Sequence, residues 1–326
     1  MFQKILILTF ILFGCKTGID VIEEDDALLS LGHLLFFDTR LSVNNTKSCS
    51  SCHNPDLAFT DGYRTSITSM GEHLQRNAPS LLNIDQFKFY NLADTTIRSL
   101  FLQHAKPLYS KHPIELGLHL DSANIFTGIS KDRHYRPLLK QLNIERLNDF
   151  WLRTALSRYV RSLVTTKSAW DKYKVGDKKS LNKEQLQGLA LFVSEKFRCA
   201  QCHKLPNFTS NTSTTDFSSI YHLIPLNPTD SGLYKITGRP EDIFKFRVSG
   251  LRNIALTAPY FHDGSAPDLS SVLKHYETHK TNYGIPNSET WTDNEKKAII
   301  HFLHSLTDSS IFANPIFKNP FHATVP

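Results

Sequence analysis

Apolar residues recur along this chain with the spacing of helices rather than strands. Trp151, Ala155, Tyr159 and Leu163 stand four residues apart, and a second apolar row follows one position later. This spacing places one apolar stripe along a single helix face. No segment keeps up a strict alternation of apolar and polar residues. The pattern therefore predicts a mainly α fold in which long loops connect the helices.

Polar residues mark the start of two further helices. Thr292 and Glu295 have the spacing of a capping box ahead of an apolar-periodic segment. Asp268 is the expected N-cap of another helix, whose apolar face includes Tyr276 and from which His275 points away. On this pattern alone, Tyr276 is most simply a core tyrosine.

The two halves of the chain repeat one series of signals. A glycine-led apolar segment occupies residues 32–36 and again 188–192. A C-x-x-C-H motif follows each segment, at residues 49–53 and 199–203, and a phenylalanine comes shortly after each motif. The duplication predicts two domains, each with a helix that leads into its motif.

C-x-x-C-H is the attachment signal of c-type haem. Its two thiols form thioethers to the porphyrin, and the histidine becomes the proximal ligand of the iron. The expected haem-binding residues are Cys49, Cys52, His53, Cys199, Cys202 and His203. Two covalent haems would make this a redox protein.

Zinc binding and disulfide bonds are the alternative uses of these cysteines. Zinc accepts Cys and His ligands, but zinc ribbons usually place their pairs closer together and need no histidine after each pair. A disulfide framework is unusual in a chain of 326 residues with five cysteines. The duplicated motif favours haem over both alternatives.

The fifth cysteine, Cys15, ends an N-terminal export signal. Lys4 precedes about ten apolar residues, too few to span a membrane. Residues 12–15 resemble a bacterial lipobox, although Phe13 is bulky for that pattern. We expect a signal over residues 1–15, a tether over 16–25 and a periplasmic protein held by a lipid at Cys15. Plain cleavage or an uncleaved anchor are the alternatives.

Charge, length and local composition limit the expected partners and the domain organisation. The formal net charge is +6 without a basic run, so nucleic acid is not an expected partner. The length suits two domains, expected over residues 26–165 and 166–326. Residues 207–230 are rich in Ser, Thr and Asn and predict a long loop.

Methionine is scarce, which limits the choice of a sixth iron ligand. The chain has two methionines, Met1 in the signal and Met70 in the first half. A His/Met electron-transfer haem in the second half is therefore not expected.

Ordered blocks of this chain resemble the bacterial dihaem cytochrome c peroxidase and MauG family. The resemblance covers nearly all of the mature sequence. The matching blocks are residues 31–42, 49–53, 76–81, 103–117, 199–203, 251–264 and 319–321. The resemblance implies a division of labour in which the N-terminal haem meets peroxide and the C-terminal haem receives electrons.

The resemblance also implies the residues of a distal pocket above the first haem. Gln103, Pro107 and Glu115 match a Gln, a Pro and a Glu of the family. Heterolysis of peroxide needs a proton to move between its two oxygens, and Glu115 would carry it as general base and then acid. Gln103 would hold the peroxide by hydrogen bonds. Without the resemblance, Glu115 is an ordinary surface carboxylate.

Two further sites follow from the resemblance. Asn77, Thr257 and Pro259 match residues that bind a calcium ion between the domains through oxygen ligands. Tyr276 stands where the peroxidases carry an axial Met of the second haem and where MauG carries a Tyr. A phenolate ligand there would stabilise ferric and higher iron states.

Two departures from the family pattern affect electron transfer and gating. Residues 91–96 replace a segment that usually carries a Trp between the haems, and none is present here. His73 lies near the place of a gating histidine, but its spacing to Asn77 is short, so a solvent-exposed His73 is the favoured interpretation.

Three functions compete on this evidence. The first is reduction of hydrogen peroxide with electrons from a small periplasmic donor such as a c-type cytochrome. The second is a MauG-like oxidase acting on a protein or organic substrate, favoured by Tyr276. The third is electron transfer alone. Glu115 and Gln103 argue against it, because an electron carrier does not need them. The resemblance allows a homodimer.

Overall fold

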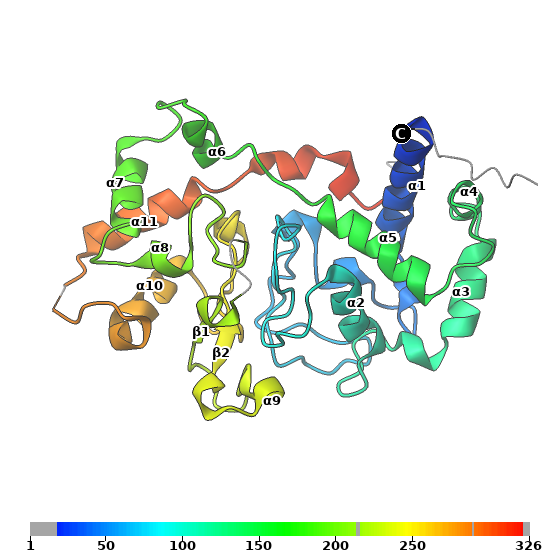
Figure 1. The fold of residues 1–326 in the computed structure, drawn as a ribbon, viewed down its shortest axis with the longest axis horizontal. Helices are drawn as coiled ribbons and strands as arrows, with labels where there is room; N and C mark the ends of the chain where they lie inside the picture. Colours follow the sequence, from blue (N-terminus) through cyan, green and yellow to red (C-terminus); the bar gives the residue numbers. More distant parts are fainter. Residues whose placement is uncertain (1–17, 213–215, 289, 322–326) are drawn as a thin grey trace, which may run out of the picture.

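The computed structural model describes residues 18–212, 216–288 and 290–321 (Figure 1). The predicted signal and Cys15 lie outside the described residues. The helices of the first half are α1 (Gly18–Phe37), α2 (Leu100–Tyr109), α3 (Ser122–Lys131), α4 (Arg136–Gln141) and α5 (Asp149–Arg161). The second half contains α6 (Ala169–Lys174), α7 (Lys183–Phe192), α8 (Cys199–Cys202), β1 (Tyr221–Leu223), α9 (Tyr234–Thr237), β2 (Lys245–Arg247), α10 (Leu269–Thr278) and α11 (Asp293–His304). The predicted mainly α fold is confirmed, and no helix among the described residues is long and apolar enough to cross a membrane.

Each half is organised around one close helix crossing. In the first half, α1 packs against α5, and a Cβ built on Gly32 would lie 2.0 Å from the carbonyl oxygen of Ala155. In the second half, α7 packs against α11, and a Cβ on Gly188 would lie 2.0 Å from the carbonyl oxygen of Ala298. Only glycine lets the two backbones approach this closely. The predicted duplication is therefore present in three dimensions.

The predicted helix starts are confirmed. Asp268 accepts a hydrogen bond from the backbone N–H of Ser271 at 2.7 Å and caps α10. Thr292 and Glu295 form the reciprocal capping box of α11. These caps satisfy backbone donors that have no partner within the helix.

One of the two expectations about irregular segments is wrong. The predicted tether over 16–25 is helical from Gly18 onward. Asp25 forms an ion pair with Arg158 of α5 at 2.5 Å. This tertiary contact fixes a segment whose polar, acidic sequence is typical of a solvated linker. The predicted loop over 207–230 is irregular over most of its described residues, and it includes the short strand β1, which pairs antiparallel with β2.

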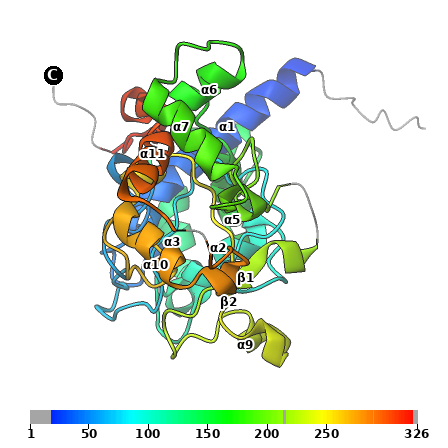
Figure 2. The same cartoon turned by 90° about the vertical axis from the view of Figure 1, so that its left-hand side faces the viewer.

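The two halves of the chain lie side by side (Figure 1). Figure 2, turned by 90°, shows α7, α10 and α11 in the half that faces the viewer. The chain after α11 runs back to the first half, where Ile311 and Phe317 are buried in the core formed by α1 and α5. The C-terminal segment therefore stabilises the first half and ties the halves together.

We predict that Gly188→Ala destabilises the protein by about 1–3 kcal/mol, the usual cost of overpacking a close contact. The added methyl group would clash with the carbonyl oxygen of Ala298 and push α7 away from α11. Denaturant unfolding followed by circular dichroism measures the change.

Gly128→Ala is the matched control. Gly128 lies in α3 with no atom within 4 Å of the added Cβ. Alanine there should stabilise the helix by about 0.5–1 kcal/mol. Equal effects of the two substitutions would contradict the role assigned to the crossing.

Candidate haem sites

The first motif forms a tight turn that presents its histidine from a fixed backbone. Residues Cys49–Ser51 form a 3₁₀ turn, and the backbone N–H of His53 donates to the carbonyl of Cys49 at 3.0 Å. The Nδ1 atom of His53 bonds the carbonyl of Phe59 at 3.0 Å. A carbonyl oxygen only accepts, so Nδ1 carries the proton and Nε2 keeps its lone pair for a metal.

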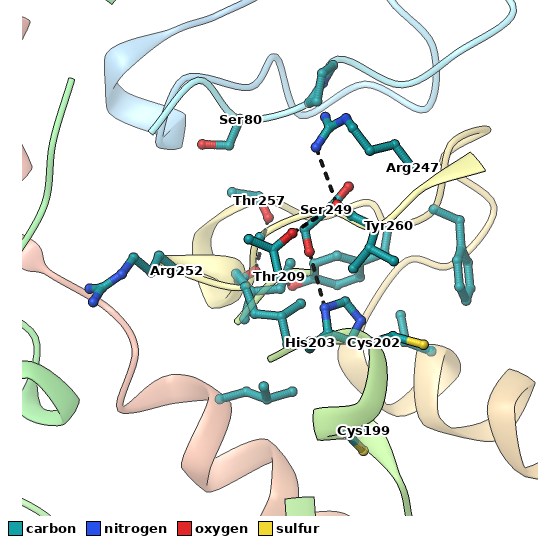
Figure 3. Close-up of a pocket in the computed structure, with 18 of the residues that line it drawn as sticks. Ser80, Cys199, Cys202, His203, Thr209, Arg247, Ser249, Arg252, Thr257 and Tyr260 are labelled. Atoms are coloured by element: carbon teal, nitrogen blue, oxygen red, sulfur yellow. Dashed lines mark hydrogen bonds between the residues drawn. The ribbon is translucent and has the colours of Figure 1, made fainter. Parts of the chain in front are cut away.

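The second motif repeats this geometry on α8. The backbone N–H of His203 donates to the carbonyl of Cys199 at 2.9 Å. The Nδ1 atom of His203 bonds the carbonyls of Phe208 and Ser249 at 3.2 and 3.1 Å, and Figure 3 shows the Ser249 contact. Both histidines therefore have the tautomer that an iron ligand needs.

The phenylalanine after each motif aims the carbonyl that holds the histidine. Phe59 and Phe208 have positive φ angles of 61° and 55°, a conformation that costs a non-glycine residue about 1 kcal/mol or more. Both side chains are fully buried, Phe59 against Phe36 and Phe208 against Phe302. Burial of these rings offsets the backbone strain. The recurring aromatic in the sequence is explained by this role.

The four described cysteines fit thioether attachment better than either alternative. All four are free thiols, so no disulfide links them. Burial raises the pKa of Cys49 and of Cys199 to about 12, so both thiols are protonated at neutral pH when no group is bound to them. Within the described part of the chain, no three His, Cys, Asp or Glu residues gather as a metal site.

A largely apolar pocket lies in front of the second motif. Its walls include Cys199, Cys202, His203, Leu273 and Phe246. Residues of the first half close its far side, with Ser80 shown at the top of Figure 3. An apolar pocket with two thiols and one imidazole at its wall is what a covalently attached porphyrin requires.

Tyr276, which the helix periodicity places on the inward face of α10, lies in the wall of this pocket. Burial, and then the nearby Tyr283 and Cys202, raise the pKa of its hydroxyl. Its ring packs at 4.7 Å from the ring of Tyr283. His275 is turned toward a different partner, since its Nε2 bonds the hydroxyl of Tyr283 at 2.8 Å.

Glu115 lies on a loop that is fastened beside α2. The backbone N–H of Leu116 donates to the carbonyl of Pro107 at 3.1 Å, and that of Glu115 to the hydroxyl of Ser110 at 2.9 Å. The carbonyl of Glu115 in turn accepts from the backbone of Ser69 at 2.9 Å. Burial raises the pKa of the Glu115 carboxyl, which makes it a better proton carrier near neutral pH.

Gln103 is oriented by a residue of the segment that lacks the tryptophan. The Nδ2 of Asn91 donates to the Oε1 of Gln103 at 3.1 Å. This contact leaves the amide N–H₂ of Gln103 as the group available to a ligand. Gln103 and Pro107 stand four residues apart on α2 and therefore share one helix face. The loop that carries Glu115 is bonded to the same helix at Pro107.

Two residues with buried polar atoms were not identified from the sequence. His104 follows Gln103, and its Nε2 is buried with no hydrogen-bond partner among the described residues. Burial, followed by the charge of the nearby His53, lowers the pKa of His104 to about 3. Arg247, at the end of β2, lines the pocket of the second motif. Neither position carries a local sequence signal, because each depends on what the fold places around it.

The three residues expected to bind calcium line the same pocket as the second motif. Asn77, Thr257 and Pro259 all contribute to its wall. The Nδ2 of Asn77 donates to the carbonyl of Tyr63 at 2.9 Å. His73 is exposed, as the favoured interpretation holds, and its Nδ1 contacts the hydroxyl of Thr65 at 3.4 Å.

Comparison with known proteins agrees with this geometry. Residues 26–179 match the family model of di-haem cytochrome c peroxidase. The cytochrome c551 peroxidase of Nitrosomonas europaea is 32% identical over 92% of this chain and 84% of its own length. The chain belongs to the di-haem cytochrome c peroxidase family.

Relatives within the family include MauG-type proteins. The methylamine utilization protein MauG of Methylophilus methylotrophus is 27% identical over 76% of this chain and 72% of its own length. A crystal structure of a MauG-like protein associated with microbial copper homeostasis superposes with a TM-score of 0.84 at 32% identity, covering 91% of this chain and 93% of that one. The fold of this di-haem peroxidase family member is therefore shared along nearly its whole length.

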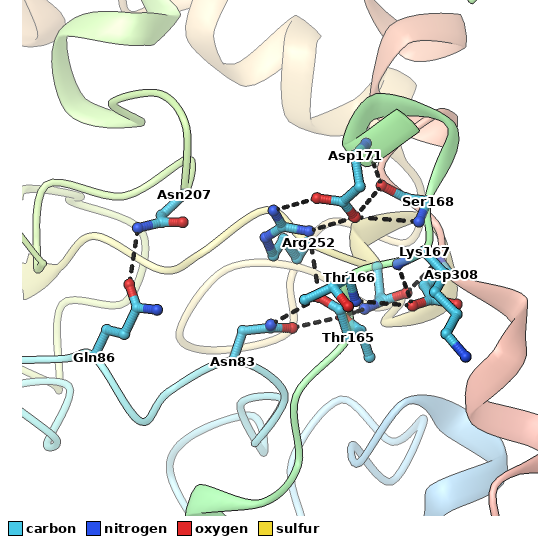
Figure 4. Close-up of polar contacts among 11 residues, drawn as sticks. Asn83, Gln86, Thr165, Thr166, Lys167, Ser168, Asp171, Asn207, Arg252 and Asp308 are labelled. Carbon is cyan, nitrogen blue, oxygen red and sulfur yellow. Dashed lines mark hydrogen bonds and ion pairs between the residues drawn. The ribbon is translucent and has the colours of Figure 1, made fainter. Parts of the chain in front are cut away.

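A buried ion pair holds the segment that joins the halves of this family member (Figure 4). The guanidinium of Arg252 donates to both carboxylate oxygens of Asp171, at 2.7 and 2.9 Å. Ser168 also donates to Asp171, at 2.7 Å. Asp308 receives the backbone N–H groups of Thr166 and Lys167 at 3.0 and 2.8 Å. The linker after α5 is thereby fixed to the second half.

We predict that Asp171→Asn destabilises the protein by about 3–5 kcal/mol, because it leaves the buried Arg252 without a counter-charge. Burial opposes ionisation of Asp171, but the hydrogen bonds from Arg252 and Ser168 hold its pKa below the ordinary value of 3.8. A lowered folded-state pKa means that this stabilisation is present above the ordinary pKa and is lost as the pH falls through the folded value. Thermal unfolding between pH 2 and pH 7 tests this.

Asp56→Asn serves as the control for that substitution. Asp56 is exposed and meets Lys318 at 3.6 Å, so its replacement should change stability by about 0.5 kcal/mol or less. An Asp171→Asn protein as stable as this control at neutral pH would contradict the assigned role.

Proposed function

We propose that this chain is a di-haem peroxidase in which the first haem site reduces hydrogen peroxide and the second supplies the electrons. Two haem c groups, attached through Cys49 and Cys52 and through Cys199 and Cys202, would provide the one-electron chemistry. The peroxidase proposal depends most on the position of Glu115. Burial raises the pKa of its carboxyl, and a backbone hydrogen bond holds its loop to Pro107 of α2.

The reaction consumes one peroxide, two electrons and two protons and yields two waters. Glu115 accepts the proton of the near peroxide oxygen and returns it to the oxygen that departs. The amide N–H₂ of Gln103 donates a hydrogen bond that orients the peroxide, since Asn91 occupies its carbonyl oxygen. Pro107 anchors the Glu115 loop through its carbonyl.

The remaining assignments belong to the same proposal. The electrons come from a small periplasmic donor such as a c-type cytochrome, and a lipid at Cys15 holds the protein at the membrane. A calcium ion binds between the halves through Asn77, Thr257 and Pro259, which support this by sharing one pocket wall. Carbonyl and amide oxygens are the ligands that calcium prefers.

A MauG-like oxidase is the second candidate, and one observation favours it. Tyr276 lies in the pocket wall together with Cys199, Cys202 and His203. A tyrosinate ligand to the second iron favours oxidised over reduced states. Such a site would share oxidising equivalents with the first haem and act on a protein or organic substrate. Turnover of peroxide with a reduced cytochrome distinguishes the two functions.

We predict that Glu115→Gln slows peroxide turnover by about a hundredfold or more, the usual scale of general acid–base catalysis. The amide keeps the size of the side chain but can neither accept nor release a proton at neutral pH. Stopped-flow kinetics of the reduced protein with peroxide measure the rate.

Glu184→Gln provides the matched control, since Glu184 is exposed in the first turn of α7. Its turnover should equal that of the wild type. Equal rates for Glu115→Gln and the wild type would remove Glu115 from the mechanism.

We predict that Tyr276→Phe removes a ligand of the second iron while packing is retained. The substitution deletes only the hydroxyl oxygen, so a tyrosinate-type spectral signal should vanish and the potential of that haem should rise. Electron paramagnetic resonance and spectrophotometric redox titration measure both.

Tyr283→Phe is the control in the same pocket wall. The substitution removes the same hydroxyl group from a tyrosine whose ring centroid lies 4.7 Å from that of Tyr276. It should leave the ligand signal in place. Loss of the signal in Tyr283→Phe instead would assign the ligand to Tyr283. Unchanged spectra in Tyr276→Phe would leave Tyr276 a core residue.

A further inference from the structure

Arg247 is a buried cation at the wall of the pocket in front of the second motif. Its side chain is 5% exposed, and its backbone N–H donates to the carbonyl of Leu92 at 2.8 Å, which fixes β2 against the first half. Its guanidinium lies over the ring of Phe87, 4.8 Å from the centroid. Nη1 donates to the carbonyl of Val248 at 3.3 Å, whereas Nε has no partner among the described residues.

The charge of Arg247 has no counter-ion within the described part of the chain. Two other arginines close to this region are neutralised, Arg252 by Asp171 at 2.7 Å and Arg76 by Asp230 at 2.7 Å. Burial lowers the pKa of Arg247 to about 10, so the side chain remains a cation at neutral pH. A buried charge without a partner costs several kcal/mol. An anion bound in the pocket beside Arg247 would remove this cost.

The position of Arg247 indicates which anion that is. Figure 3 shows Arg247 at the end of the pocket remote from Cys199, with His203 between them. A porphyrin of the haem type carries its vinyl groups, which become the thioethers, at one edge and its two propionate carboxylates at the opposite edge. A haem attached at Cys199 and Cys202 would present a propionate toward the guanidinium.

We propose that Arg247 binds a propionate carboxylate of the haem attached to Cys199 and Cys202. Arginine suits this task because its planar fork of N–H donors matches a carboxylate. The unpaired Nε would donate to one carboxylate oxygen, and the ion pair would neutralise two charges in an apolar pocket. The proposal rests on the proposed attachment of a second haem.

Arg247→Met tests this assignment in the intact haem protein. Methionine keeps the length of the side chain but leaves the propionate anion uncompensated, which favours the ferric state. At fixed potential and neutral pH, the ratio of reduced to oxidised second haem should fall about tenfold, or about 59 mV for one electron. The propionate bending band in the resonance Raman spectrum should also shift. Arg247→Lys keeps the cation and should recover most of the potential.

Arg252→Met is the matched control, because Arg252 lines the same pocket but is held by Asp171. It should lower stability without moving the propionate band. An unchanged band and potential in Arg247→Met, or a shift of the band in Arg252→Met instead, would overturn the proposal. Loss of the second haem in Arg247→Met but not in Arg247→Lys would support it. A wild-type protein that carries no haem at Cys199 and Cys202 would refute the proposed function, and the assignment of Arg247 would fail with it.

Discussion

The hydrogen bond from each motif histidine to a backbone carbonyl is the interaction on which the sites depend. Phe59 holds the Nδ1 of His53 at 3.0 Å, and Phe208 holds that of His203 at 3.2 Å. The bond fixes the protonated nitrogen, orients the ring and leaves Nε2 as a ligand. Positive φ angles at both phenylalanines aim the carbonyls, and burial of the rings offsets that strain. The folded core therefore determines how each imidazole is presented to a metal.

The same arrangement is built twice from helices that cross at a glycine. Gly32 and Gly188 let α1 meet α5 and α7 meet α11 at backbone contact, ahead of each motif. The halves then diverge in the residues around the pockets. The first places Gln103 and Glu115 beside α2, whereas the second places Tyr276 and Arg247 around an apolar pocket. One scaffold thereby carries two different sets of side chains, to which the proposed function assigns proton transfer in the first half and electron transfer in the second.

Features with a local signal were predictable from the sequence, and features that depend on tertiary contact were not. The haem motifs, the capping residues Asp268 and Thr292 and the inward face of Tyr276 follow from spacing within one element. The acidic residues around Asp25 are typical of a solvated tether. Its ion-pair partner Arg158 is 133 residues away in sequence, so no local pattern indicates the contact. Arg247 resembles any arginine until the fold buries it without a carboxylate.

The most direct test of this account is a count of covalently bound haem in each half of the chain. The protein is denatured and digested, the pyridine haemochrome spectrum is recorded, and the peptides are identified by mass spectrometry. The account predicts two haem c groups per chain, one on the peptide that contains Cys49 and Cys52 and one on the peptide that contains Cys199 and Cys202. A single haem, or unmodified thiols with bound zinc at either motif, would contradict it.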